Sequence, residues 1–197
     1  MCDMETIFKM TPDKPNAGSA QEFGRPLPGF SLPVLGGRDK RTLQDCLVGK
    51  TGGVIVFWSA ICAHCRRYDE YLNSFAELHP QLALTAIASR YGETPVQMQT
   101  ALRQRQLIFP VLLDQSSEVA CQWHAQQTPR SYLIDPDGQL VYRGAIDNFK
   151  HPLDAGYVAF LEPAIRSYLA GQSIARVETA SFGCAIDTAY YHLPRQL

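Results

Sequence analysis

The chain has 197 residues, and 46% of them are hydrophobic, which suits one compact domain with a sizeable core. Eighteen basic and nineteen acidic residues leave a net charge of -1, which gives no reason to expect nucleic acid or an anionic membrane as the partner. No run approaches the ~20 consecutive apolar residues of a membrane span. The start, Met1 to Glu5, lacks the apolar core of a secretory signal, so a cytoplasmic location is expected; a removed signal or a misplaced start codon would make the protein periplasmic or exported.

The N-terminal third of the chain leads into a buried strand. Residues 1–22 are polar and lack an apolar period, which predicts a flexible arm. Residues 28–37 predict short strands around a Gly-Gly turn, and residues 43–47 a short helix. Residues 53–58 are continuously apolar and rich in β-branched side chains, which is typical of a strand buried on both faces.

Helices and strands alternate in the middle of the chain. Apolar residues recur at helical spacing after Cys65 until Pro80, which predicts a helix that starts at or near Cys62. Further elements are expected as a strand at 82–88, a helix at 95–106 and a strand at 109–113. This order predicts a parallel βαβα arrangement.

An antiparallel part follows. Residues 116–125 fit a short helix, and the strands expected at 131–134 and 139–143 flank the turn sequence Asp-Pro-Asp-Gly, which indicates a tight hairpin. The last helix should run from Tyr157 through Leu169 and stop at Gly171, with Pro163 either kinking it or sitting in its first turn. The pattern predicts an α/β fold whose central mixed sheet is flanked by helices, over residues 23–170, with a tail of residues 171–197 packed on or near it.

Six cysteines lie at positions 2, 46, 62, 65, 121 and 184, and only Cys62 and Cys65 are closely spaced. The chain is therefore not a dense disulfide framework, and the scattered cysteines and histidines give no paired zinc ligands, so no metal is expected. Two cysteines separated by two residues at a helix start can bridge. Cys62 should be the more acidic thiol, because free backbone amides and the helix dipole favour an anion there. Cys65 can then resolve a mixed disulfide.

His64 lies between the two thiols. When protonated it would favour the thiolate over the disulfide and move the couple towards the oxidising side of the usual range. The alternative is an exposed helix residue without a tuning role.

Residues 56–65 resemble the active-site segment of thioredoxin-like proteins, closest to the TlpA/ResA and redoxin (AhpC/TSA-like) group. The Phe30–Pro33 segment and residues 128–138 resemble two further stretches of that group. The resemblance implies a thioredoxin fold and a thiol-disulfide oxidoreductase that exchanges with a disulfide- or dithiol-containing protein or a small thiol, without a cofactor. It also implies a cis Pro129 that holds the partner beside the cysteines, together with Thr128 and Trp58. An ordinary strand-edge proline is the alternative for Pro129.

The sequence also departs from these families. Val56 stands where thioredoxins commonly carry a buried aspartate, and Tyr68 where the TlpA/ResA group often has a glutamate. On a helix, Asp69 and Glu70 are rotated by about 100° per residue from Tyr68, so neither is assigned as the base that accepts the Cys65 proton. Ile61 replaces the usual tryptophan before the first cysteine, which alters the expected docking surface.

Two other functions remain as alternatives. A peroxiredoxin-like peroxidase would use Cys62 to attack peroxide, and Ser59 matches that family's hydroxyl residue, although Ile55 replaces its proline and Cys65 favours dithiol exchange. A copper-binding module is the non-enzymatic alternative, since soft thiolates select Cu(I), but no partner histidine can be assigned.

The tail carries one further thiol, Cys184, in the segment Phe182–Ile186. It is either a third redox thiol or a buried free cysteine, and the second is the commoner fate. The other cysteines, Cys2, Cys46 and Cys121, have no motif around them and are expected to be structural.

Overall fold

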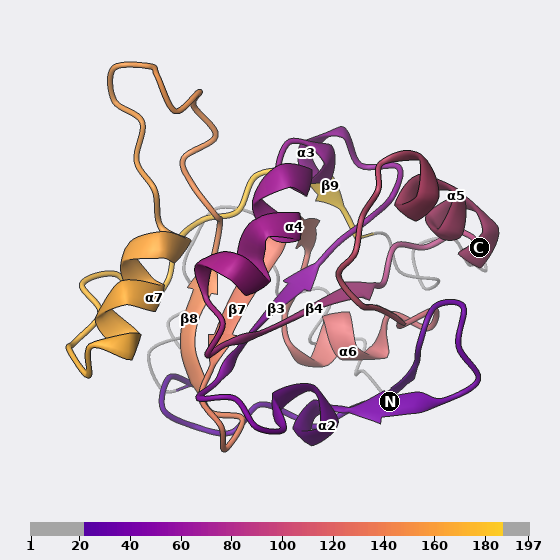
Figure 1. Ribbon diagram of the computed structural model, residues 1–197, viewed down its shortest axis with the longest axis horizontal. Helices are drawn as coiled ribbons and strands as arrows, with labels where there is room; N and C mark the ends of the chain where they lie inside the picture. The colour runs from indigo at the N-terminus through magenta and orange to yellow at the C-terminus, as the bar shows by residue number, and fades with distance from the viewer. Residues whose placement is uncertain (1–21, 187–197) are drawn as a thin grey trace, which may run out of the picture.

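A five-stranded mixed sheet forms the centre of the computed structural model, which describes residues 22–186 (Figure 1). The strand order is β5-β4-β3-β7-β8. Strands β3 (Gly53–Phe57), β4 (Ala83–Ala88) and β5 (Val111–Leu113) are parallel. Strand β7 (Arg130–Ile134) runs antiparallel to β3, and β8 (Leu140–Gly144) antiparallel to β7. The predicted parallel part and the hairpin after it are confirmed.

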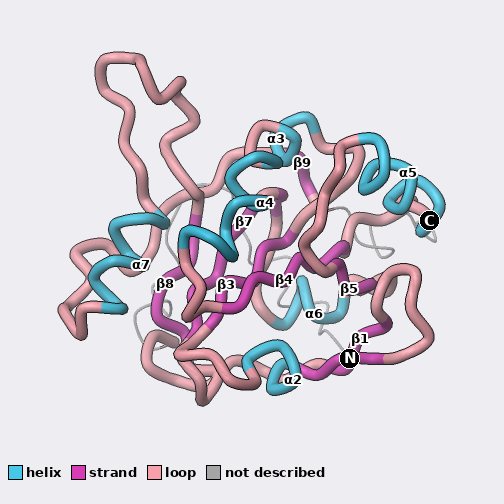
Figure 2. Tube along the Cα trace, in the orientation of Figure 1, coloured by secondary structure: helices cyan, strands magenta, loops and turns pink. Residues whose placement is uncertain are grey.

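Helices cover both faces of this sheet (Figures 1 and 2). One hydrophobic cluster contains residues of α4 (Asp69–Leu78), α5 (Pro95–Gln104) and α7 (Leu161–Leu169). The second contains residues of α2 (Leu43–Leu47) and α6 (Glu118–Gln122). Because neighbouring side chains of a strand point to opposite faces, β3 feeds both clusters: Val54 and Val56 enter the first, Ile55 and Phe57 the second. This double burial explains the continuous apolar run of β3.

The N-terminal elements are short. Strands β1 (Ser31–Pro33) and β2 (Lys40–Thr42) pair antiparallel, and Thr42 then caps α2. Its hydroxyl accepts a hydrogen bond from the Asp45 amide, while the Asp45 carboxylate accepts one from the Thr42 amide. This reciprocal capping stabilises a helix of only five residues.

The helix predicted from Cys62 is divided in two. Helix α3 (Ala63–Arg66) ends in a turn at which the Tyr68 amide donates to the Cys65 carbonyl at 3.0 Å, and α4 begins at Asp69. This hydrogen bond joins residues three apart in place of the four of an α-helix, so it interrupts the helix, although the helical spacing of apolar residues continues through it.

The last helix, α7, begins at Leu161 and not at Tyr157. The amides of Phe160 and Leu161 both donate to the Ile146 carbonyl, so the chain just before the helix is held beside the segment that follows β8. Pro163 lies in the first turn of α7, where its missing amide hydrogen leaves no gap in the hydrogen bonding.

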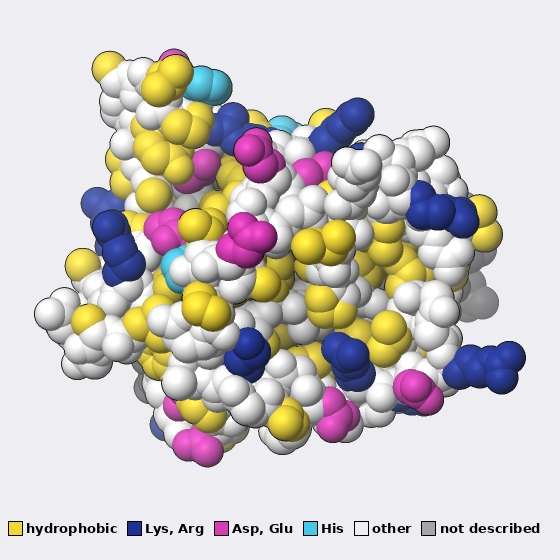
Figure 3. Space-filling view, viewed as in Figure 1, with side chains coloured by type: hydrophobic (Ala, Val, Ile, Leu, Met, Phe, Trp, Pro, Cys, Tyr) yellow, Lys and Arg dark blue, Asp and Glu magenta, His cyan; other side chains and the backbone are white. Residues whose placement is uncertain are grey.

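Charges of both signs are interspersed over the molecular face in Figure 3, in keeping with the net charge of -1. Among residues 22–186, no helix has the length and apolar character needed to cross a membrane. Within the same range, no group of three or more histidine, cysteine or acidic side chains is arranged to hold a metal ion. The predicted arm, residues 1–22, lies outside the described residues apart from Glu22.

Candidate active site

The two cysteines follow β3, at the edge of the sheet where the parallel strands end and their loops converge. Cys62 is the residue before α3; its backbone is extended (φ -82°, ψ 115°), and its carbonyl accepts the Cys65 amide at 3.1 Å. Trp58, predicted to contact the partner, is fully buried and packs edge-on against Phe109, with 5.9 Å between ring centroids. It therefore supports the cysteine loop from inside the core.

The Cys62 and Cys65 thiols are reduced and differ strongly in acidity. A hydrogen bond from the Cys65 thiol lowers the pKa of Cys62 to about 3, against the opposing effect of burial, and hydrogen bonds with Cys184 and Thr128 act in the same direction. Burial and the neighbouring Cys62 raise the pKa of Cys65 well above its usual range. At neutral pH the geometry therefore favours a Cys62 thiolate beside a protonated Cys65.

Pro129 lies beside this pair. The Thr128–Pro129 peptide bond is cis, as the resemblance implied. The carbonyl oxygen of Thr128, in β6 (Gln127–Thr128), lies 3.3 Å from the Cys62 sulfur and accepts its hydrogen bond when the thiol is protonated. The structure thus brings four of the predicted site residues together: Cys62, Cys65, Thr128 and Pro129.

The tail contributes a third thiol. Strand β9 (Cys184–Ala185) pairs antiparallel with β6 and places Cys184 opposite Thr128, whose carbonyl oxygen lies 3.3 Å from the Cys62 sulfur. Ile186, directly after it, is buried in the second hydrophobic cluster. A Cβ on Gly183 would lie 1.9 Å from the Thr128 carbonyl oxygen, so only glycine permits this close approach. Cys184 is half-buried and free, not enclosed in the core.

Glu93 is a site residue that no sequence motif indicates. Its carboxylate is buried and accepts the amide hydrogens of Ala60 (2.5 Å) and Ile61 (3.2 Å), the two residues before Cys62. Burial raises the pKa of Glu93. Its place in the loop after β4 could have suggested it, because that loop leaves the sheet at the same edge as the cysteine loop.

The side chains at positions 64 and 68 contact the segment that follows β8. The His64 ring packs against Phe149, with 4.7 Å between ring centroids. The Tyr68 hydroxyl donates to the buried Asp147 carboxylate at 2.6 Å, and burial raises the pKa of Tyr68. Tyr68 is therefore occupied by a structural hydrogen bond at the position where related proteins carry an acid.

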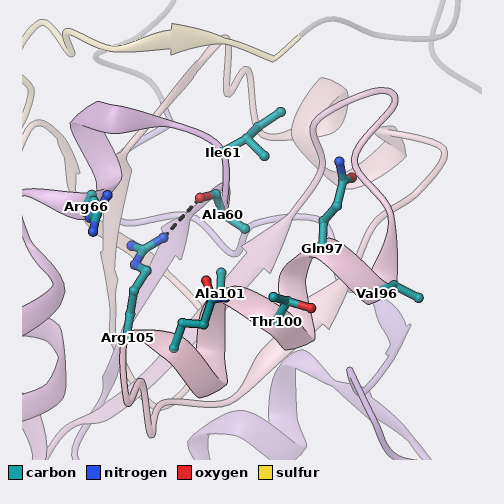
Figure 4. A pocket seen from close by; sticks show the side chains of 9 residues that line it. Ala60, Ile61, Arg66, Val96, Gln97, Thr100, Ala101 and Arg105 are labelled. Carbon is teal, nitrogen blue, oxygen red and sulfur yellow. Dashed lines mark hydrogen bonds between the residues drawn. The ribbon is translucent and has the colours of Figure 1, made fainter.

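An open groove of ≈ 390 Å³ runs between the cysteine loop and α5 (Figure 4). Its rim carries two apolar side chains, Ile61 (53% exposed) and Val96 (70% exposed). At its base, Arg105 donates to the Ala60 carbonyl at 3.0 Å and forms an ion pair with Asp69. Asp69 thus anchors the loop through Arg105 and is not directed at the thiols.

Comparison with known proteins agrees with this geometry. ResA of a Bacillus cereus strain, named as a thiol-disulfide oxidoreductase, is 29% identical over 142 residues, covering 72% of this chain and 80% of the relative. ResA of Bacillus thuringiensis subsp. konkukian is 30% identical over 120 residues, covering 61% of this chain and 68% of the relative.

Solved structures match over more of the chain. A conserved protein from Geobacillus kaustophilus aligns with a TM-score of 0.74 at 25% identity, covering 84% of this chain and 91% of that one. A protein from Sinorhizobium meliloti 1021 aligns with a TM-score of 0.72 at 28% identity, covering 83% and 93%. The thioredoxin-like fold and the resemblance to the TlpA/ResA and redoxin group are confirmed. The family model described as AhpC/TSA family matches residues 23–143, and the chain therefore belongs to the AhpC/TSA family.

Proposed function

We propose that Cys62 and Cys65 are the exchanging couple of this thiol-disulfide oxidoreductase, and that the partner is a disulfide- or dithiol-containing protein or a small thiol. One observation carries the assignment: Cys62 directly precedes α3, Cys65 lies inside that helix, and the Cys62 sulfur lies 3.3 Å from the Thr128 carbonyl oxygen, beside the cis peptide bond. A thiolate stabilised by a second thiol is the arrangement that dithiol exchange requires.

The exchange takes two displacements. The Cys62 thiolate attacks one sulfur of the partner disulfide, so that a mixed disulfide forms and one partner thiolate leaves. Cys65 then loses its proton and attacks the Cys62 sulfur, which closes the Cys62–Cys65 disulfide and releases the second partner thiolate. The partner gains two electrons, and the protein loses them. Once Cys62 is in the mixed disulfide its charge is gone, so one of the causes that raise the Cys65 pKa is removed.

Access to Cys62 limits how the partner can bind. Its side chain is only 1% exposed, and the backbone of Thr128 is already paired with β9. The groove beside Ile61 remains open next to the cysteine loop, and its apolar rim suits a nonpolar side chain of the partner. We infer that the partner approaches across Ile61 and reaches the Cys62 sulfur when β9, the segment paired with Thr128, shifts.

The test is exchange with oxidised glutathione, with Cys62→Ser and Cys46→Ala as matched variants. Cys46 is a buried free cysteine in the second hydrophobic cluster, so its replacement removes a thiol elsewhere in the fold. Cys62→Ser should abolish exchange, and Cys46→Ala should retain it.

Hydrogen peroxide distinguishes the peroxidase alternative. Consumption of peroxide well above the rate of disulfide exchange, lost in Cys62→Ser, would replace the proposed function by peroxidase activity. Exchange that survives in Cys62→Ser would contradict the assignment of Cys62.

A further inference from the structure

The site contains three thiols, whereas two are sufficient for exchange. Cys62 and Cys65 lie in one segment at the start of α3, and Cys184 lies in β9, opposite Thr128, whose carbonyl oxygen is 3.3 Å from the Cys62 sulfur. Cys65 is fully buried and Cys62 is 1% exposed, whereas Cys184 is partly exposed. Cys184 is therefore the one of the three that solvent reaches.

Several contacts hold Cys184 at this position. It pairs with Thr128 in the β6–β9 ladder, and the Ile186 amide donates to the Gln126 carbonyl at 2.7 Å. The buried Ile186 side chain anchors the end of the segment in the core, and Gly183 allows the backbone to touch the Thr128 carbonyl. A free surface cysteine would need none of these contacts, so the thiol is held against the redox centre by the fold.

We propose that Cys184 is a second resolving thiol, which displaces the partner from Cys62 by forming a Cys62–Cys184 disulfide. The proposal rests on the proposed function, because Cys62 must first hold the partner in a mixed disulfide.

The step balances as a thiol-disulfide exchange. The Cys184 thiolate attacks the Cys62 sulfur; the Cys62–Cys184 bond forms, and the bond from Cys62 to the partner sulfur breaks. The partner leaves as a thiolate with the electron pair and takes up a proton from water. A second exchange, in which Cys65 attacks Cys62, converts this disulfide to Cys62–Cys65 and returns Cys184 to the thiol form without further oxidation.

Exposure favours Cys184 over Cys65 for the first of these steps, because Cys184 is partly exposed whereas Cys65 is fully buried. Burial raises the pKa of Cys65, and the side chains that stand where related proteins carry acids, Val56 and Tyr68, provide no carboxylate. The pKa of Cys184 is also raised, first by burial and then by its contacts with Cys62, while Arg90 lowers it. Once Cys62 is in the mixed disulfide it carries no charge and no longer raises the pKa of Cys184. The Arg90 guanidinium still lowers that pKa.

Oxidised glutathione tests the proposal in a Cys65→Ser background, with the bonds mapped by mass spectrometry after acid quenching and non-reducing digestion. We expect Cys65→Ser to yield a Cys62–Cys184 disulfide and two molecules of reduced glutathione per molecule of oxidised glutathione. In Cys65→Ser with Cys184→Ser, glutathione should stay bound to Cys62, with a lifetime at least about tenfold longer. Cys65→Ser with Cys46→Ala is the matched control and should behave as Cys65→Ser alone.

Two further measurements extend the test, and the second, on the wild-type protein, does not depend on how well the serine variants fold. Gly183→Ala in the Cys65→Ser background keeps the Cys184 thiol but drives a Cβ into the Thr128 carbonyl, so the glutathione adduct should persist there too. In the wild-type protein, quenching at successive times should show Cys62–Cys184 before Cys62–Cys65.

The outcomes separate the two proposals. If glutathione leaves Cys62 equally slowly with and without Cys184, and no Cys62–Cys184 bond forms in the wild type, the resolving role of Cys184 is overturned and the proposed function stands. If no glutathione attaches to Cys62 in the double variant and no Cys62–Cys184 bond forms in any form of the protein, both proposals are overturned.

Discussion

Replacing Cys65 by alanine should raise the pKa of Cys62, because the hydrogen bond from the Cys65 thiol is the largest cause that lowers it. A hydrogen bond to a charged group contributes about 1.5–3 kcal/mol, and one pKa unit corresponds to about 1.4 kcal/mol. The loss of this bond should therefore raise the Cys62 pKa by about 1–2 units. The pKa should still lie below that of an ordinary thiol, because the hydrogen bonds with Cys184 and Thr128 remain.

The assay is the ultraviolet absorbance of the thiolate during an acid titration, with the same variant carrying Cys62→Ser as the blank. Cys65→Ser is the matched control, since its hydroxyl can still donate to the Cys62 sulfur and should give a smaller shift. A Cys62 pKa that is unchanged or lower in Cys65→Ala would refute the reasoning.

The low pKa of Cys62 in the folded protein makes the stability of the reduced protein depend on pH. The folded-state pKa of Cys62 lies below its unfolded value, so the thiolate contributes stability that is lost as the pH falls towards about 3. Urea denaturation of the reduced protein should show this loss, and Cys62→Ser should flatten the profile.

Three further substitutions test the scaffold. Glu93→Ala should slow exchange and lower the free energy of unfolding by about 1–3 kcal/mol, because two loop amides lose their acceptor, whereas Glu93→Gln keeps an acceptor and should remain close to wild type; equal losses would contradict this. Gly52→Ala should cost about 1–3 kcal/mol in urea denaturation, since its Cβ would lie 2.6 Å from the Ile134 carbonyl oxygen, whereas Gly29→Ala meets nothing within 4 Å and should be neutral. Tyr68→Phe should cost about 1–3 kcal/mol through the hydrogen bond it loses, with the exchange rate retained; a large loss of rate would place Tyr68 in the chemistry.

Local patterns in the sequence were sufficient to predict the central sheet. The apolar run at residues 53–58 predicted a strand buried on both faces, and β3 supplies side chains to both clusters. The hairpin turn between β7 and β8 and the helix start at Cys62 were equally local, because turn and cap residues act within a few positions. The boundary at Tyr68 could not be predicted, since the apolar period of the helix continues through the turn.

The parts of the site that the sequence could not predict depend on long-range pairing. The β6–β9 ladder joins Thr128 to Cys184, and no periodicity connects segments so far apart in the chain. Glu93 likewise contacts the cysteine loop only because two neighbouring parallel strands end at the same edge of the sheet. The spacing therefore predicted the redox pair and the resemblance predicted Thr128 and Pro129 beside it, but neither indicated Glu93 or the strand pairing that brings Cys184 to the site.

The reduction potential of the Cys62–Cys65 couple tests the central claim most directly. It is measured by equilibrating the protein with glutathione buffers of stepped composition and mapping the disulfide by mass spectrometry at each step. Because the reduced form is stabilised by the Cys62 thiolate, the couple should titrate as a two-electron transition at a potential above thioredoxin's ≈ -270 mV. A potential at or below that value, or no Cys62–Cys65 disulfide at any step, would contradict the account.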